Sequence, residues 1–141
     1  MSQDCIFCSI VAGDIPGRVV YEDEDTLAFL DANPLAAGHT LVVPKEHYER
    51  VNDLSAGVAA AIGEAIATVA PAVESAVDAP ASTIAYNNGE AAGQEVPHVH
   101  AHVVPRFPDD GGRPIHSLFG DRPELSDAEL DDVAERIADR A

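Results

Sequence analysis

Short runs of apolar or alternating residues, separated by polar and acidic turns, recur along the first 105 residues of the chain. Residues 19–21 and 26–30 flank the acidic turn at residues 22–25, which predicts a β-hairpin. Three further runs predict strands at residues 39–43, 82–86 and 98–104. The pattern therefore predicts about five strands.

A long stretch between these strands carries apolar residues at spacings of four and three, the period of an α-helix. The stripe consists of Val58, Ile62, Ile66, Val69, Val73 and Val77. Ser55 is placed to cap this helix, and we expect Pro71 to kink or weaken it because proline has no N–H. Ser126 and Glu129 have the spacing of a capping box and predict a short amphipathic helix near the end of the chain. Strands early and late with one long helix between them favour an α+β fold with an antiparallel sheet and short terminal helices.

The composition is that of one folded domain with an unusual charge. The chain has 141 residues, and 46% of them are hydrophobic, which suits a single core. Its 25 acidic residues against 8 basic ones give a formal net charge of −17. This charge argues against binding to nucleic acids or anionic membranes, because such binding relies on Lys and Arg. Lys45 is the only lysine. An acid-rich, lysine-poor surface is similar to that of haloarchaeal proteins, so we expect a halophilic archaeal origin.

No segment is expected to cross a membrane or to direct export. The sequence has no run of about 18 apolar residues, the length needed to span a bilayer. The N-terminus lacks a basic region followed by an apolar segment, so no signal peptide is expected. We therefore expect a cytoplasmic protein.

Three histidines alternate with apolar residues in the last predicted strand of the sheet. Side chains two residues apart point to the same face of a strand, so His98, His100 and His102 are expected on one face. A solvated polar face, a three-histidine metal site and nucleophilic histidine chemistry all fit this pattern. We favour the third, because imidazole is largely neutral near pH 7 and already nucleophilic.

The sequence around this strand resembles the signature of the histidine triad (HIT) superfamily. The signature lies at residues 93–106, and further matching segments precede it in order at residues 5–8, 13–16, 27–31 and 38–45. Within the superfamily the chain is similar to the Hint-like branch of bacteria and archaea. The resemblance covers residues 5–106 and implies a HIT domain over residues 1–108. Residues 109–141 would form an acidic C-terminal tail with a short helix, as part of the same domain.

The resemblance implies a nucleotide-binding hydrolase or transferase. It would cleave a nucleoside monophosphate from a leaving group at the α-phosphate, as in a phosphoramidate or another adenylate. His100 would attack phosphorus and form a covalent nucleotidyl-histidine that water then hydrolyses. His102 would orient the phosphate or protonate the leaving group, and His39 would hydrogen-bond within the histidine cluster. A dinucleoside polyphosphate hydrolase of the Fhit-like type and a nucleotide sensor without catalysis are the alternatives.

The resemblance also assigns the contacts to a purine nucleotide. The six residues concerned are Ile6, Phe29, Asp31, Asn87, Gln94 and Glu95. Asp31 would accept hydrogen bonds from the ribose hydroxyls, with a plain turn residue before a proline as the alternative. Phe29 would enclose the base or serve only in the core. Glu95 stands where eukaryotic Hint-like members have a hydroxyl residue, so we expect its backbone N–H to contact phosphate and its side chain to face solvent.

Cys5 and Cys8 have the spacing of two thiolate metal ligands. The spacing alone also allows inert free thiols, whereas a redox pair is disfavoured because the surrounding βαβ pattern is missing. By resemblance to prokaryotic HIT proteins, His47 and His98 would complete a Cys₂His₂ site for a structural zinc ion, leaving His100 and His102 for catalysis. No organic cofactor is expected. The resemblance further implies a homodimer, formed through the long helix and an edge strand.

Overall fold

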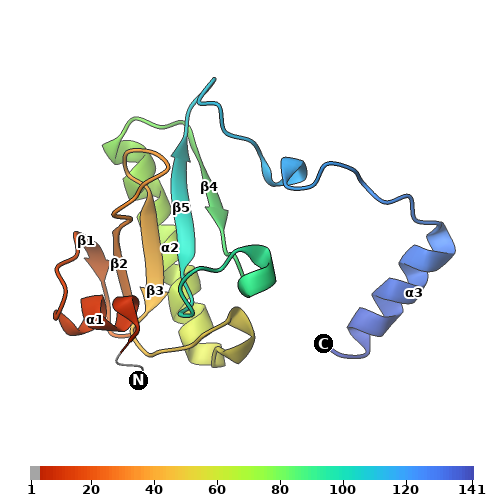
Figure 1. Cartoon of the computed structure of the whole chain (residues 1–141), viewed down its shortest axis with the longest axis horizontal. Coiled ribbons are helices and arrows are strands. Elements are labelled where there is room, and N and C mark those ends of the chain that lie inside the picture. The colour runs from red at the N-terminus through yellow and green to blue at the C-terminus, as the bar shows by residue number, and fades with distance from the viewer. Residues whose placement is uncertain (1–3) are drawn as a thin grey trace. The chain divides into compact units, whose positions relative to one another are not determined.

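The computed structural model describes residues 4–141, and the chain divides into two compact units, residues 1–110 and 111–141, which are described separately. The first unit contains a five-stranded antiparallel sheet with the strand order β1-β2-β3-β5-β4 (Figure 1). Its strands are β1 (Val19–Glu22), β2 (Thr26–Leu30), β3 (Thr40–Pro44), β4 (Ala81–Ala85) and β5 (Ala101–Arg106). The predicted five-stranded α+β fold is confirmed.

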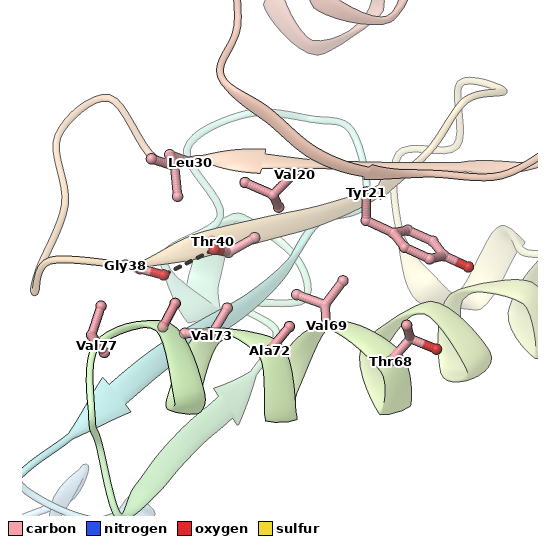
Figure 2. A pocket seen from close by; sticks show the side chains of 11 residues that line it. Val20, Tyr21, Leu30, Gly38, Thr40, Thr68, Val69, Ala72, Val73 and Val77 are labelled. Atoms are coloured by element: carbon pink, nitrogen blue, oxygen red, sulfur yellow. Dashed lines mark hydrogen bonds between the residues drawn. The ribbon is translucent and has the colours of Figure 1, made fainter.

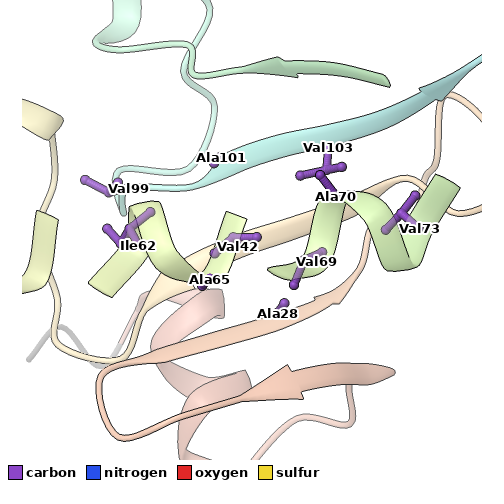
Figure 3. Close-up of a cluster of buried hydrophobic side chains, with 10 residues drawn as sticks. All are labelled: Ala28, Val42, Ile62, Ala65, Val69, Ala70, Val73, Val99, Ala101 and Val103. Carbon is purple, nitrogen blue, oxygen red and sulfur yellow. The ribbon is translucent and has the colours of Figure 1, made fainter. Parts of the chain in front are cut away.

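Two helices cover opposite faces of this sheet, α1 (Ile6–Ala12) and α2 (Ala56–Ala76). Side chains alternate along the strands, so neighbouring residues of β3 face different helices. Val42 belongs to the core cluster with α2, whereas Leu41 belongs to the cluster with Phe7 of α1. Figure 3 shows the α2 cluster, in which the helix contributes Ile62, Ala65, Val69, Ala70 and Val73.

Helix α2 begins as the sequence predicts and continues through its proline. The hydroxyl of Ser55 accepts a hydrogen bond from the N–H of Val58 at 3.3 Å. Pro71 does not interrupt the helix. The missing N–H deprives the carbonyl of Ala67 of its partner, and both residues are exposed, so water can satisfy that carbonyl.

By length and composition, α2 is apolar enough to cross a membrane, contrary to the expectation that no segment is. The core helix of a soluble protein meets the same criterion, and the buried stripe of α2 packs on the sheet. One such helix is therefore weak evidence for a membrane span.

The strand predicted at residues 98–104 begins later than expected, because β5 starts at Ala101. Strand β3 pairs with β5 only from Thr40 to Val42 and ends at Pro44, which has no N–H for the ladder. The N–H of Val99 instead bonds the carbonyl of Tyr48 at 2.8 Å. His98 and His100 thus lie on the segment that leads into β5.

The second unit contains a 3₁₀ turn (Ile115–Ser117) and helix α3 (Asp127–Ala138). The predicted capping box is present: the N–H of Glu129 bonds the hydroxyl of Ser126 at 3.1 Å, and the N–H of Ser126 bonds the Glu129 carboxylate at 3.2 Å. The helix is confirmed. Its assignment to one domain with the first 108 residues stays a prediction.

Candidate active site and metal centre

The two cysteines lie at the start of α1, where the helix geometry brings their sulfur atoms to one point. Cys5 is the N-cap, and its Sγ accepts the N–H of Cys8 at 3.3 Å. Both thiols are buried and neither forms a disulfide. A CxxC segment at a helix N-terminus therefore presents two sulfur ligands together.

Two histidines complete this group, as predicted. Nδ1 of His98 lies 3.3 Å from Sγ of Cys5 and 3.5 Å from Sγ of Cys8. Nδ1 of His47 lies 3.3 Å from Sγ of Cys8 and 3.2 Å from Nδ1 of His98. A zinc ion with bonds of about 2.3 Å to sulfur and about 2.0 Å to nitrogen spaces tetrahedral ligands by roughly these distances.

The protonation state of His98 also suits a metal ligand. Its Nε2 donates to the carbonyl of Pro44 at 2.9 Å, which leaves the lone pair of Nδ1 directed at the two sulfurs. The ring is fully buried, and burial lowers its pKa, which keeps it neutral. The four side chains of Cys5, Cys8, His47 and His98 thus form a donor set that suits a metal site.

His100 has one defined free nitrogen. Its Nδ1 lies 2.7 Å from the carbonyl of His98, which can only accept, so Nδ1 carries the proton. Nε2 therefore keeps its lone pair. The ring is 9% exposed and packs edge-on against Phe7, with the ring centroids 5.0 Å apart. This arrangement fixes the orientation of the ring and leaves the lone pair of Nε2 available.

His39 and His102 are ordered by a chain of hydrogen bonds that starts from the backbone. The N–H of Leu35 donates to Nδ1 of His39 at 3.0 Å, so Nε2 of His39 carries the proton. That Nε2 donates to Nδ1 of His102 at 2.9 Å. The remaining proton of His102 is consequently on Nε2, which is buried and has no partner within residues 4–141. An unsatisfied buried donor beside the His100 ring, whose centroid is 5.0 Å away, is suited to an anionic ligand.

The electrostatics keep both rings neutral near pH 7. Burial lowers the pKa of His39, while the nearby Asp31 carboxylate opposes this shift. The pKa of His102 is lowered to about 4, mainly by burial and further by His100 and His39. Asp31 lies with one oxygen 3.6 Å from Nε2 of His39. The Asp31, His39 and His102 side chains also meet closely enough to hold an ion, although the 2.9 Å bond already uses one nitrogen of each ring.

Two of the residues assigned to the base occupy different surroundings. Phe29 is buried in the middle of β2, packs against Phe7 with ring centroids 5.5 Å apart, and belongs to the α1 core cluster. Ile6 is about half exposed at the start of α1.

Asp31 follows β2, and one of its oxygens accepts the N–H of Asn33 at 2.9 Å, the bond of a turn residue. Its other oxygen faces the histidines.

The segment between β4 and His98 uses most of its polar groups internally. The amide of Gln94 accepts from the N–H of Gly89 at 2.8 Å and donates to the carbonyls of Glu49 and Val96 at 2.7 and 3.0 Å. The N–H groups of residues 92–94 bond carbonyls of the same loop. Asn87 and Glu95 are exposed and have no such bond within the described part of the chain. Gln94 therefore braces the loop, and Glu95 has the N–H left for a ligand.

An apolar cavity lies away from the histidines. About 390 Å³ in volume, it lies between α2 and β1–β3 (Figure 2). Its lining includes Tyr21, Leu30, Thr40 and Val73, and Thr40 donates to the carbonyl of Gly38 at 2.8 Å. It opens on the α2 face of the sheet, whereas His100 contacts Phe7 of α1 on the other face. The described residues that line this cavity include no histidine, carboxylate or cationic side chain.

Comparison with known proteins supports the resemblance. Residues 12–109 match the family model described as the HIT domain. The chain is 43% identical to an uncharacterized HIT-like protein of Methanocaldococcus jannaschii, over 94% of this chain and 98% of that protein. It is 40% identical to an adenosine 5′-monophosphoramidase of Schizosaccharomyces pombe, over 74% and 75% of the two chains. It is 38% identical to an adenylylsulfatase of Arabidopsis thaliana, over 75% of this chain and 54% of that protein.

Solved structures share the fold over nearly the whole chain. A HIT-family protein from Bacillus subtilis aligns with a TM-score of 0.86 at 38% identity, covering 99% of this chain and 98% of that one. A zinc-bound histidine triad family protein from Mycobacterium smegmatis aligns with a TM-score of 0.71 at 32% identity, covering both chains completely.

Proposed function

Because the chain belongs to the HIT family, we propose that it hydrolyses nucleotides that carry a leaving group on the α-phosphate of a nucleoside monophosphate. The observation that carries this proposal is the pair of free ring nitrogens. Nε2 of His100 holds a lone pair, and Nε2 of His102 holds a proton that has no partner among the described residues. The first is suited to attack phosphorus, and the second to bind a phosphoryl oxygen.

In the proposed reaction, Nε2 of His100 forms a bond to phosphorus while the bond from phosphorus to the leaving group breaks. The imidazole becomes positively charged, and its Nδ1 keeps its proton and donates it in a hydrogen bond to the carbonyl of His98, 2.7 Å away. Water then attacks the nucleotidyl-histidine and releases the nucleoside monophosphate. His102, with a pKa of about 4, acts in the free enzyme as a neutral hydrogen-bond donor rather than as an acid.

A zinc ion in the Cys₂His₂ set would have a structural role. Its four ligands, Cys5, Cys8, His47 and His98, leave no open position for substrate, as in structural zinc sites. When bound, the metal would supply a cross-link between the start of α1 and the segment before β5. The chemistry stays on His100, whose Nε2 lies outside this donor set.

The two named relatives suggest the substrate class. One is named for an adenosine phosphoramidate and the other for adenylyl sulfate, and both substrates are adenosine monophosphate joined to a small leaving group. We propose the same class for this chain. A dinucleoside polyphosphate hydrolase would use the same nucleophile with a larger leaving group.

A homodimer is also proposed. Strand β4 ends the sheet, so the edge of β4 away from β5 has no strand beside it within the described residues. Ile84 of this strand is 45% exposed. Joining two such edges would continue the sheet across a two-fold axis. Analytical ultracentrifugation in molar salt tests this, and a monomer at micromolar concentration would contradict it.

Mass spectrometry after brief exposure to an adenosine phosphoramidate tests the catalytic proposal. We expect an adenylate adduct on the peptide that contains His100. The variant His100→Ala should lose the adduct and fall in turnover by up to about 10⁶-fold, as for removal of a covalent nucleophile. The matched control His116→Ala, in the second unit, should keep both. Tight nucleotide binding without an adduct or turnover would instead identify a sensor.

A further inference from the structure

The guanidinium of Arg50 lies against the loop that leads to the histidines. A Cβ atom on residue 89 would lie 3.0 Å from Nη2, 3.1 Å from Cζ and 3.4 Å from Nε of Arg50. Gly89 also has a φ of +98°, which side-chain-bearing residues rarely adopt. Glycine at this position therefore lets the guanidinium lie on the loop backbone.

The backbone around Arg50 is fastened to the same loop on both sides. The N–H of Val51 bonds the side-chain oxygen of Asn88 at 3.0 Å. The carbonyl of Glu49 accepts from the Gln94 amide at 2.7 Å, and the carbonyl of Tyr48 accepts from Val99 at 2.8 Å. The backbone at Arg50 is thus fixed relative to the segment that ends in the histidines.

The guanidinium of Arg50 forms no ion pair within residues 4–141, and the nearby Asp53 carboxylate accepts the backbone N–H of Arg50 at 3.2 Å. By contrast, Lys45 pairs with Glu22 at 2.7 Å and Arg106 with Asp110 at 2.8 Å. A guanidinium has five N–H donors in a planar fork that matches sulfate and phosphate oxygens.

We propose that Arg50, held on the loop of residues 89–94, binds an anionic leaving group: a tetrahedral sulfate or phosphate joined to the α-phosphate. This inference rests on the proposed function, because it assigns the leaving-group side of that site. As His100 bonds to phosphorus, the bond from phosphorus to the bridging oxygen breaks. Its electron pair departs with the oxyanion, which needs no proton, and Arg50 stabilises the added negative charge.

An amine leaving group needs a proton rather than stabilisation of a negative charge. Ammonia departs from a phosphoramidate only with an added proton, and a guanidinium does not give one up near neutral pH. Arg50 should therefore favour oxyanion leaving groups and contribute little to phosphoramidate cleavage. Both substrate types contain the same adenosine monophosphate. A difference between them in the effect of an Arg50 variant therefore reports on the leaving group.

The test compares adenylyl sulfate, diadenosine triphosphate and adenosine phosphoramidate at one fixed salt concentration. Arg50→Gln should lower kcat/KM for the first two by about tenfold or more, the effect of losing a charge-assisted hydrogen bond, and leave the third within about twofold. Arg50→Lys, which keeps the charge without the fork, should lose less. Arg18→Gln is the matched control, because Arg18 is exposed before β1 and also has no ion pair in the described residues. Melting temperatures verify that the variants fold.

The outcomes are distinguishable. A loss with adenylyl sulfate alone supports a sulfate subsite, and a loss with diadenosine triphosphate alone supports a phosphate subsite. Equal losses for all three substrates, or no loss, would overturn the role of Arg50 while leaving the proposed function standing. A wild-type protein that turns over none of them would instead refute the proposed function.

Discussion

At the scale of single residues, the site depends on which nitrogen of each ring carries the proton. The order is imposed by backbone groups: the N–H of Leu35 acts on His39, and the carbonyl of His98 acts on His100. Because His39 in turn donates to Nδ1 of His102, the proton of His102 lies on Nε2. The N–H of Leu35 thus determines this tautomer through two successive hydrogen bonds. His39 is therefore a positioning residue in this arrangement.

Replacing His39 tests this order. His39→Leu removes both the acceptor for Leu35 and the donor to His102, so His102 is free to move its proton to Nδ1. We expect kcat to fall by about 10- to 100-fold, within the range for loss of an oriented donor. His39→Gln, whose amide can both accept and donate, should retain more activity. Nitrogen NMR of the His102 ring should show the change of tautomer in the leucine variant, and an unchanged tautomer would contradict the role.

The lowered pKa of His102 predicts a dependence of stability on pH. Its pKa is about 4 in the folded protein and about 6.5 when exposed, so between these values the unfolded chain binds more protons. The stabilisation is present above about pH 6.5 and is lost as the pH falls toward 4. After allowance for solvent screening, wild type should lose about 1 kcal/mol more than His102→Gln between pH 7 and pH 5. Denaturant titrations of both proteins measure this difference, and parallel pH curves would contradict it.

At the scale of elements, the start of α1 and the lead-in to β5 share one residue. Nδ1 of His98 faces the two cysteines, while its carbonyl holds the proton of His100. Phe7 of the same helix packs on the His100 ring. The metal donor set and the His100 ring are therefore linked through a single residue and one helix.

Metal removal should consequently affect both stability and catalysis. Chelation should lower the melting temperature by about 5 °C or more, the shift expected for loss of about 2 kcal/mol in a chain of this size. Turnover should fall with it and return when zinc is restored. Cys8→Ser should reproduce the effect and reduce the bound metal measured by elemental analysis. Full activity and an unchanged melting temperature in metal-free protein would contradict this linkage.

The elements also show how far the sequence predicts this molecule. The spacing of apolar residues predicted the strands and α2. Alternating residues in the strands and the stripe that includes Ile62 and Val69 in α2 are the side chains that the fold buries. The late start of β5 was missed because it depends on where β3 ends, which is a property of the partner strand. Arg50 was missed because its contact with Gly89 joins residues 39 positions apart and leaves no local pattern.

At the scale of the whole molecule, the net charge of −17 acts against the proposed substrates, which are also anions. The long-range field should slow their association in dilute buffer. Screening reduces its range to about 10 Å at 0.1 M salt and about 3 Å at 1 M. Hydrogen bonds to the substrate act over about 3 Å, which is close to the screening length at 1 M salt. We therefore expect substrate binding at the histidines to continue at salt concentrations that remove the long-range repulsion.

Activity should therefore rise with salt toward the molar range. We expect kcat/KM for adenylyl sulfate to increase severalfold from 0.05 M to 1 M potassium chloride, because the screening length falls below the size of the site. The melting temperature should rise in parallel as repulsion between the acidic side chains is screened. A neutral osmolyte at matched osmolality is the control, since it leaves the charges unscreened and should not raise kcat/KM. A protein most active in dilute buffer would contradict the expected adaptation to salt. It would also show that long-range repulsion does not limit the association of the anionic substrate.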